Sequence, residues 1–172
     1  MGVVLIGYRG TGKSTTGALL AQRLGRPFVD LDRSIEAAAG CSIAALFANE
    51  GEPVFRDWEE RVIAQETAGG GKVIATGGGA ILRESNRIAL RRHGVVVWLS
   101  AAPEVIAERL RGDAERPALT NLGTLGEIRE VLAARTPVYR SLADVEVATE
   151  GRSPEEVVET ILGLLPEVAR KG

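Results

Sequence analysis

The chain reads Gly7-Tyr8-Arg9-Gly10-Thr11-Gly12-Lys13-Ser14 directly after the apolar run Val3-Val4-Leu5-Ile6. The eight residues match the phosphate-loop pattern G-x-x-x-x-G-K-[ST], and the apolar run predicts a buried strand ahead of them. Glycines at the end of a strand let the backbone turn tightly and bring consecutive N–H groups onto a phosphate. The pattern therefore predicts nucleotide binding, with Lys13 reaching the β- and γ-phosphates and the Ser14 hydroxyl ligating Mg²⁺.

Length and composition favour one α/β domain. The chain has 172 residues, of which 45% are hydrophobic, and this is enough for one well-packed core. The 23 acidic and 21 basic residues nearly cancel, so no overall charge favours nucleic acid or an anionic membrane as a partner. The apolar runs are too short to span a bilayer. We expect a soluble protein, and because nothing in the sequence indicates an obligate interface, we expect a monomer.

The few sulfur and imidazole groups exclude some chemistries. One cysteine, Cys41, cannot form an internal disulfide and fits a reducing cytoplasm. The single histidine, His93, lies in a basic run before Gly94, which is typical of a helix end. One cysteine and one histidine at unrelated positions do not form a zinc site. Because the phosphate loop begins at Gly7, we expect no leader peptide ahead of it and a cytoplasmic location.

Short β-rich runs alternate with longer helical patterns, which indicates a parallel sheet covered by helices on both faces. The predicted strands are residues 2–6, 27–30, 72–76, 95–99 and 144–148. The predicted helices are residues 13–24, 33–39, 42–48, 52–67, 84–93, 103–110, 125–139 and from 154 onward. The last helix has a clear start, because Ser153, Pro154 and Glu156 form a capping-box pattern.

Residues 111–123 do not fit a packed core, since they are polar, punctuated by glycine and proline, and long for an ordinary connection. In a phosphoryl-transfer enzyme such a segment can form a mobile lid that closes over the nucleotide and keeps water out. Arg116 would then bring a positive charge to the phosphates. The alternative is an ordinary surface loop.

Two carboxylates follow the second predicted strand. Asp30 and Asp32 are two residues apart, so their side chains point to the same side for as long as the chain stays extended. Ligands of parallel sheets bind at the carboxyl ends of the strands, where the phosphate loop also lies. We expect Asp30 to support Mg²⁺ and Asp32 to accept a hydrogen bond from the hydroxyl that is phosphorylated. No acidic residue follows the third strand, which puts more weight on Asp30 as the metal residue.

A glycine run and an arginine complete the candidate site. Gly77–Gly79 follows the third strand, where its N–H groups would face a ligand, whereas Gly69–Gly71 precedes that strand and indicates a turn that ends a helix. Arg56 lies on a predicted helix, and Glu59 at i+3 is placed to orient its guanidinium. With eighteen arginines in the chain, most must be solvated surface charges.

Taken together, the motifs closely resemble those of the bacterial shikimate kinase family, in order and over nearly the whole chain. They are G-Y-R-G-T-G-K-S-T from Gly7, the pair Asp30 and Asp32, G-E-x-x-F-R-x-x-E at 51–59, T-G-G-G at 76–79, R-P-A-L at 116–119 and R-x-P-x-Y at 135–139. The resemblance implies a three-layer P-loop kinase fold with a five-stranded parallel sheet of order 2-3-1-4-5. It also implies that ATP phosphorylates the 3-hydroxyl of shikimate, on the route to chorismate and the aromatic amino acids.

The same resemblance implies roles for individual residues. ATP would be bound by Gly10, Thr11, Gly12, Lys13, Ser14, Thr15, Arg116 and Arg152, with Ser14 and Asp30 at Mg²⁺. Shikimate would be bound by Asp32, Phe47, Phe55, Arg56, Gly77, Gly78, Gly79 and Arg135. The catalytic residues would be Lys13, Asp32 and Arg116. Residues 1–172 would form one domain, in which residues 33–62 bind shikimate and residues 111–123 form the lid. Within the R-P-A-L motif, this chain has Ala118 where the family commonly has leucine.

Two other functions stay open at this point. One is another small-metabolite kinase of the same architecture, acting on gluconate or on a nucleoside monophosphate. The other is a catalytically silent ATP-binding module that has kept the fold. Against the second, every motif position expected to act is chemically intact in this sequence.

Overall fold

The structure, a computed structural model, describes residues 1–111 and 125–170. One sheet of five parallel strands runs in the order β2-β3-β1-β4-β5, which confirms the predicted topology. The strands are β1 (Gly2–Ile6), β2 (Phe28–Asp30), β3 (Val73–Ala75), β4 (Gly94–Ser100) and β5 (Val145–Ala148). The central strand β1 pairs with β3 and β4, and Val4 lies opposite Ile74 on one side and Val96 on the other.

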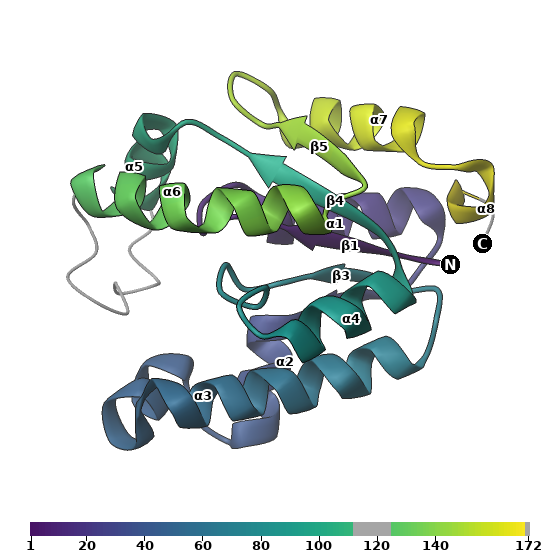
Figure 1. The fold of residues 1–172 in the computed structure, drawn as a ribbon. Coiled ribbons are helices and arrows are strands. Elements are labelled where there is room, and N and C mark those ends of the chain that lie inside the picture. Colours follow the sequence, from purple (N-terminus) through teal and green to yellow (C-terminus); the bar gives the residue numbers. More distant parts are fainter. Residues whose placement is uncertain (112–124, 171–172) are drawn as a thin grey trace.

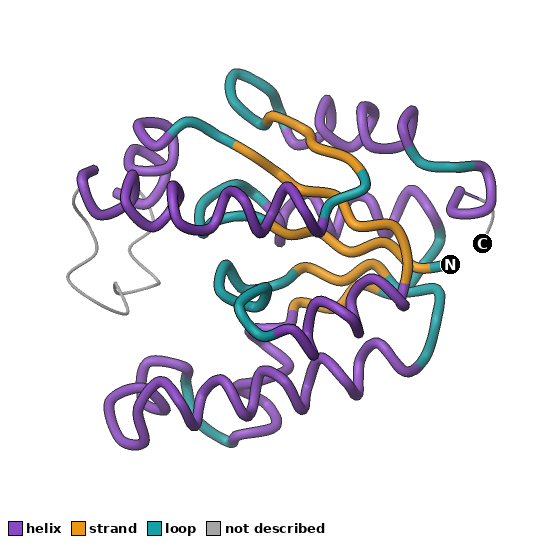
Figure 2. Tube along the Cα trace, in the orientation of Figure 1, coloured by secondary structure: helices purple, strands orange, loops and turns teal. Residues whose placement is uncertain are grey.

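Helices cover both faces of the sheet and produce the three layers visible in Figures 1 and 2. They are α1 (Lys13–Leu24), α2 (Leu31–Ala39), α3 (Ile43–Ala68), α4 (Glu84–His93), α5 (Pro103–Arg111), α6 (Leu125–Leu142), α7 (Pro154–Leu164) and α8 (Glu167–Arg170). Successive residues of a strand point to opposite faces. Val4 and Ile6 accordingly pack with residues of α2, α3, α4 and α6, while Val3 and Leu5 pack with residues of α1, α7 and α8. Both faces of β1 are therefore buried.

The turn after β2 differs from the sequence prediction. The chain does not stay extended through Asp32, because α2 begins at Leu31 and Asp30 is its N-cap. Asp30 Oδ1 accepts hydrogen bonds from the backbone N–H groups of Asp32, at 3.1 Å, and Arg33, at 3.4 Å. A carboxylate that accepts hydrogen bonds from two otherwise unpaired N–H groups favours the start of a helix. Because Asp30 makes these bonds, the chain turns into α2 instead of staying extended. Asp32 therefore projects from the first turn of α2.

The helical region between residues 33 and 67 contains a second correction. The two helices predicted at 42–48 and 52–67 are joined in α3, with a sharp break at Gly51. Gly51 has a φ of 84°, which lies in the left-handed region that favours glycine. Two helical segments therefore exist as predicted, but without a loop between them. The predicted lid at 111–123 lies, apart from Arg111, outside the described residues.

The capping box at the start of α7 is present as predicted. The Ser153 hydroxyl accepts from the Glu156 N–H at 3.2 Å, and the Glu156 carboxylate accepts from the Ser153 N–H at 2.8 Å. We expect Ser153→Ala to lower the free energy of unfolding by about 1 kcal/mol, because the N-cap oxygen is lost. Urea denaturation measures the change, and Ser153→Asp is the control, since aspartate caps as well as serine. Equal losses in both variants would contradict this role of the hydroxyl.

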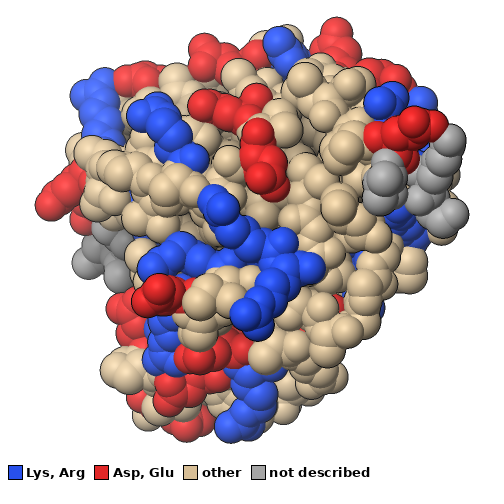
Figure 3. Space-filling view, turned by 45° about the vertical axis from the view of Figure 1, so that its right-hand side comes forward, with Lys and Arg blue, Asp and Glu red and all other residues tan. Residues whose placement is uncertain are grey.

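The surface carries charges of both signs. On the face seen in Figure 3, basic side chains form a band across the middle, with acidic side chains above and below it. This distribution agrees with the near balance of acidic and basic residues in the chain. Within residues 1–111 and 125–170, no helix combines the length and the apolar character that crossing a membrane requires.

Candidate active site

The phosphate loop joins the central strand β1 to the first turn of α1. Gly10 and Gly12 have φ values of 80° and 89°, so the loop uses the left-handed conformations for which glycine is suited. Lys13 is buried at the start of α1, and its Nζ donates to the Tyr8 carbonyl oxygen at 2.8 Å. The Thr11 hydroxyl donates to the same carbonyl at 2.8 Å. The ammonium group is thus held over the loop, beside the N–H groups that begin α1.

The candidate metal residues lie side by side. The Ser14 hydroxyl donates to Asp30 Oδ2 at 2.6 Å, while Oδ1 of the same carboxylate caps α2. Among the described residues, no group of three or more histidine, cysteine or acidic side chains could hold a metal ion. A hydroxyl and one carboxylate suit Mg²⁺, which usually takes its remaining ligands from water and substrate phosphates. The donor set therefore fits a magnesium ion bound together with a nucleotide.

Each glycine of the run Gly77–Gly79 faces a different predicted site residue. A Cβ atom on the first glycine would lie 2.8 Å from Asp32 Oδ1, and one on the second would lie 3.4 Å from Arg135 Nη1. A Cβ atom on the third would lie only 2.5 Å from Arg56 Nη2. Side chains at the first and third positions would push Asp32 and Arg56 away from the loop, whereas at the second position the distance to Arg135 is an ordinary contact. The structure thus brings together residues of α2, α3 and α6 around the loop that follows β3.

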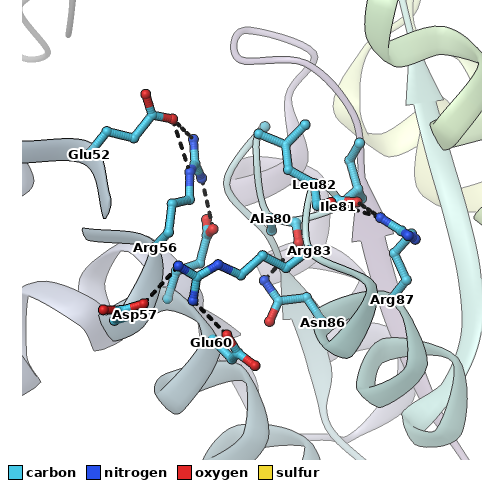
Figure 4. Close-up of polar contacts among 12 residues, drawn as sticks. Glu52, Arg56, Asp57, Glu60, Ala80, Ile81, Leu82, Arg83, Asn86 and Arg87 are labelled. Atoms are coloured by element: carbon cyan, nitrogen blue, oxygen red, sulfur yellow. Dashed lines mark hydrogen bonds and ion pairs between the residues drawn. The ribbon is translucent and has the colours of Figure 1, made fainter. Parts of the chain in front are cut away.

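Two glutamates of α3 hold Arg56 in place. Its Nη1 donates to Glu59 Oε2 at 2.7 Å, and its Nη2 and Nε donate to Glu52 Oε1 at 3.1 and 3.2 Å. Figure 4 shows Glu52 and Arg56 facing each other on α3. The predicted pairing of Arg56 with Glu59 is confirmed, and Glu52 is an additional partner that the sequence analysis missed. Its i, i+4 spacing to Arg56 was the signal that could have found it.

Glu59 is almost completely buried, with 1% of its surface exposed. Burial raises the pKa of its carboxyl above 4.5, although the neighbouring Arg56 acts in the opposite direction. The folded protein therefore binds more protons at this site than the unfolded chain between the two pKa values. The stability that comes from this proton uptake is complete below 4.5 and is lost as the pH rises through the folded-state pKa.

We expect the free energy of unfolding of the wild type to fall, relative to that of Glu59→Gln, as the pH rises from about 4 to about 7. The reason is that glutamine has no proton to lose, so the variant lacks the pH-dependent loss described above. Urea denaturation of both proteins across this range measures the difference. A difference that stays constant with pH, or that grows in favour of the wild type, would contradict the raised pKa.

An aromatic wall lies beside the arginine. The rings of Phe47 and Phe55 have centroids 4.6 Å apart, and the Arg56 guanidinium carbon lies 4.9 Å from the centroid of the Phe55 ring. Phe55 is buried, whereas Phe47 is half-buried. The two predicted apolar residues are therefore in contact, next to a cation that stacks on one of them.

The remaining predicted nucleotide residues that the structure describes are exposed. Thr15 is exposed at the start of α1, and Arg152 is exposed after β5, where its Nη1 donates to the Thr160 hydroxyl at 3.4 Å. Arg116 lies outside the described residues.

Arg109 was not singled out from the sequence, and it contacts the phosphate loop. Its Nη1 donates to the Gly10 carbonyl at 3.2 Å and to the Thr149 hydroxyl at 3.0 Å, and its Nη2 donates to the Thr149 carbonyl at 3.0 Å. The side chain thus ties α5 to the phosphate loop and to the segment that follows β5. No sequence signal distinguished it from the other arginines, because its partners are backbone groups and a threonine forty or more positions away.

A phosphate loop after the central strand of a 2-3-1-4-5 parallel sheet, with two guanidinium groups and a carboxylate gathered around the neighbouring glycine loop, defines a P-loop phosphotransferase. The phosphate loop and the residues around Gly77–Gly79 come from different elements, and both lie at the carboxyl ends of the strands. The family model described as shikimate kinase matches residues 9–166, and the chain belongs to this family. The chain is therefore an ATP-dependent phosphotransferase that acts on a hydroxyl group.

Individual relatives agree with this family. The chain is 49% identical over 174 residues to the shikimate kinase of Symbiobacterium thermophilum, with 100% of both chains covered. It is 46% identical to the shikimate kinase of Rhodopirellula baltica, over 94% of this chain and 89% of the relative. Among solved structures, the shikimate kinase of Acinetobacter baumannii in complex with shikimate superposes with a TM-score of 0.87 at 36% identity, covering 95% of this chain and 91% of the other.

Proposed function

We propose that the chain transfers the γ-phosphoryl group of ATP to the 3-hydroxyl of shikimate, with the residues described above in the roles that the motifs imply. The observation that carries this assignment is the run Gly77–Gly79, whose three positions face Asp32, Arg135 and Arg56 in turn. One carboxylate and two guanidinium groups around an N–H-rich loop match a ligand that has hydroxyls at one end and a carboxylate at the other.

On the phosphate side, the backbone of Gly10–Thr15 and the Lys13 ammonium bind the triphosphate. Lys13 is already held over the loop by the Tyr8 carbonyl, so little reorganisation is needed when phosphates bind. Ser14 and Asp30 would hold Mg²⁺, which when bound neutralises charge on the phosphate oxygens.

On the acceptor side, Arg56 and Arg135 grip the carboxylate together with glycine N–H groups, and Phe47 and Phe55 pack against the ring. Asp32 accepts the proton of the 3-hydroxyl as the oxygen of that hydroxyl forms a bond to the γ-phosphorus. The bond between that phosphorus and the β-phosphate oxygen breaks, and ADP leaves. Positioning and charge neutralisation contribute more to such a transfer than proton removal does.

The remaining assignments extend the same proposal. Residues 33–62 form the acceptor-binding region of a single domain, 1–172, and 111–123 act as a lid from which Arg116 reaches the phosphates. Arg152 lies against the adenine. The protein acts as a cytoplasmic monomer, without nucleic acid or a membrane as a partner. The exposure of Arg152 at the start of the segment that leads into α7 supports its role, because a planar base can stack on an accessible guanidinium.

A coupled assay of ADP release tests the function. Purified protein with ATP and Mg²⁺ is offered shikimate, gluconate or a nucleoside monophosphate as the acceptor. Of these three acceptors, we expect only shikimate to support turnover. Turnover should be lost when a chelator is added and should return with excess Mg²⁺. Turnover with gluconate or a nucleotide instead would indicate another kinase of this architecture. Binding of ATP without ADP release would indicate a silent module.

A further inference from the structure

The R-x-P-x-Y motif ends in Tyr139, a residue to which the proposed function gives no role. We propose that Tyr139 is a positioning residue for the acceptor's carboxylate, because its hydroxyl holds the Gly78–Gly79 peptide in place against α6, the helix that carries Arg135. The inference rests on the proposed function, since Arg135 and the glycine loop matter here as the groups that bind that carboxylate.

The contacts of Tyr139 join two parts of the carboxylate site. Its hydroxyl donates to the Gly78 carbonyl oxygen at 2.6 Å, which is a short bond between α6 and the loop after β3. Arg135 lies one helical turn before Tyr139 on α6, and against the larger effect of burial its positive charge lowers the pKa of that hydroxyl. The hydroxyl therefore ties the helix that carries Arg135 to the loop after β3. One hydroxyl sets the relative position of two groups that come from different elements.

The surroundings keep this hydroxyl fixed and protonated. Tyr139 is fully buried, and its ring stacks on Trp98 of β4 with centroids 5.8 Å apart and an interplanar angle of 21°. Burial raises the pKa of Tyr139 to about 12, so the group is a hydrogen-bond donor throughout the physiological range. A buried ring between a strand and a helix has little freedom to turn, so the position of the hydroxyl is set by packing.

Fixing the Gly78 carbonyl also fixes a donor. In a trans peptide the C=O of one residue and the N–H of the next point in opposite directions in one plane. The bond from Tyr139 therefore sets the direction of the Gly79 N–H. No described residue accepts a hydrogen bond from the N–H of Gly78 or Gly79, so both donors are available to a bound anion. Without such a bond, the peptide between these two glycines would rotate more freely than a peptide between any other residues.

The other carbonyl groups of the loop also accept hydrogen bonds from donors of the protein. The carbonyls of Gly77 and Gly79 accept from the N–H groups of Ala80 and Leu82, at 3.2 and 3.0 Å. Figure 4 shows the side chains of Asn86 and Arg87 on the carbonyls that follow, at 3.0 Å for Ala80, 2.8 Å for Ile81 and 2.9 Å for Leu82. Six consecutive carbonyls, from Gly77 to Leu82, are thus engaged, and among them only the Gly78 carbonyl depends on Tyr139.

The test is Tyr139→Phe, which removes one oxygen and keeps the ring on Trp98. We expect the KM for shikimate to rise roughly tenfold, with kcat and the KM for ATP changed less than about twofold, since the hydrogen bond to the loop is lost. Ser141→Ala is the matched control, because the Ser141 hydroxyl donates only within α6, to the Val138 carbonyl at 2.9 Å. The control should leave all three constants unchanged. An unchanged KM for shikimate in Tyr139→Phe would overturn the inference.

A second measurement separates positioning from general loosening of the fold. The carboxamide of shikimate has no charge, so the preference for shikimate over the carboxamide reports the grip on the carboxylate. We expect Tyr139→Phe to reduce this preference, whereas a purely structural defect would weaken both acceptors equally and would overturn the inference. The ratio of the two KM values does not depend on the fraction of folded protein, so the measurement stays informative if the variant is less stable.

A third variant distinguishes this inference from the function on which it rests. Arg135→Lys replaces a planar fork with a point charge, so the KM for shikimate should rise while that for ATP stays near its wild-type value. If Arg135→Lys had no such effect, the proposed acceptor site itself would be wrong. If Arg135→Lys had the effect and Tyr139→Phe did not, the acceptor site would stand and only the role of Tyr139 would fall.

Discussion

Lys13→Ala is expected to lower kcat by about 10²- to 10³-fold while the fold stays intact. The Lys13 ammonium lies on the Tyr8 carbonyl at 2.8 Å, at the start of α1, where it can neutralise charge that develops on the transferred phosphoryl group. Removing a preorganised electrostatic group of this kind costs about 3 to 4 kcal/mol of transition-state stabilisation. Alanine is the best helix former, so α1 should still form. Coupled assays and thermal melting measure the two effects.

Lys72→Ala is the matched control for this prediction. Lys72 lies just before β3, at the opposite end of the sheet from the phosphate loop, and its ammonium pairs with Glu66 at 2.8 Å. Losing it removes the same charge from the chain without touching the phosphates, and the pair is partly exposed, so the loss of stability should be small. Comparable kcat values in Lys13→Ala and Lys72→Ala, in folded preparations, would show that Lys13 has no part in the transfer.

Gly79→Ala is expected to raise the KM for shikimate by about a hundredfold. The added methyl group would lie 2.5, 2.6 and 2.8 Å from three atoms of the Arg56 guanidinium. That guanidinium cannot move without leaving Glu59, whose side chain is 2% exposed. Breaking a buried ion pair costs about 3 to 5 kcal/mol, because one charge is left without a partner. The variant must therefore lose either the position of Arg56 or the conformation of the glycine loop, and these are the two groups that we propose bind the acceptor's carboxylate.

Gly163→Ala provides the comparison, because a Cβ atom at Gly163 in α7 would meet nothing within 4 Å. Its kinetics should equal those of the wild type, and its stability should rise by up to about 1 kcal/mol, since alanine favours a helix over glycine. The KM for ATP should be nearly unchanged in Gly79→Ala, because the clash lies on the acceptor side. A KM for shikimate within about twofold of wild type would mean that Arg56 can be displaced without consequence.

Much of the fold could be predicted from local sequence. The phosphate loop, the strand ahead of it and the capping box at Ser153 each involve neighbours in the chain, so their physical cause lies within a few residues. The strand order came with the family resemblance. The exception near Asp30 is also local, because aspartate is a strong N-cap residue, and its bonds to the N–H groups of Asp32 and Arg33 began α2 earlier than predicted.

The sequence predicted which residues belong to the candidate acceptor site, but not how they are held. The motifs named Asp32, Arg56, Arg135 and the glycine run, and the structure places them around one loop. Neither Arg109 nor the hydroxyl of Tyr139 could be assigned a partner from the sequence. Their hydrogen bonds reach backbone carbonyls of Gly10 and Gly78, which are 99 and 61 positions away along the chain.

The sequence by itself determined that this chain binds nucleotide phosphates after a central strand, because that site is built from consecutive residues with their own conformational demands. Only the tertiary structure decided how the guanidinium groups of Arg56 and Arg109 are held, and which carbonyl the Tyr139 hydroxyl contacts. A guanidinium or a hydroxyl has the same chemistry wherever it occurs. Its role depends on the carbonyls and carboxylates that packing brings within about 3 Å, and those come from distant parts of the chain.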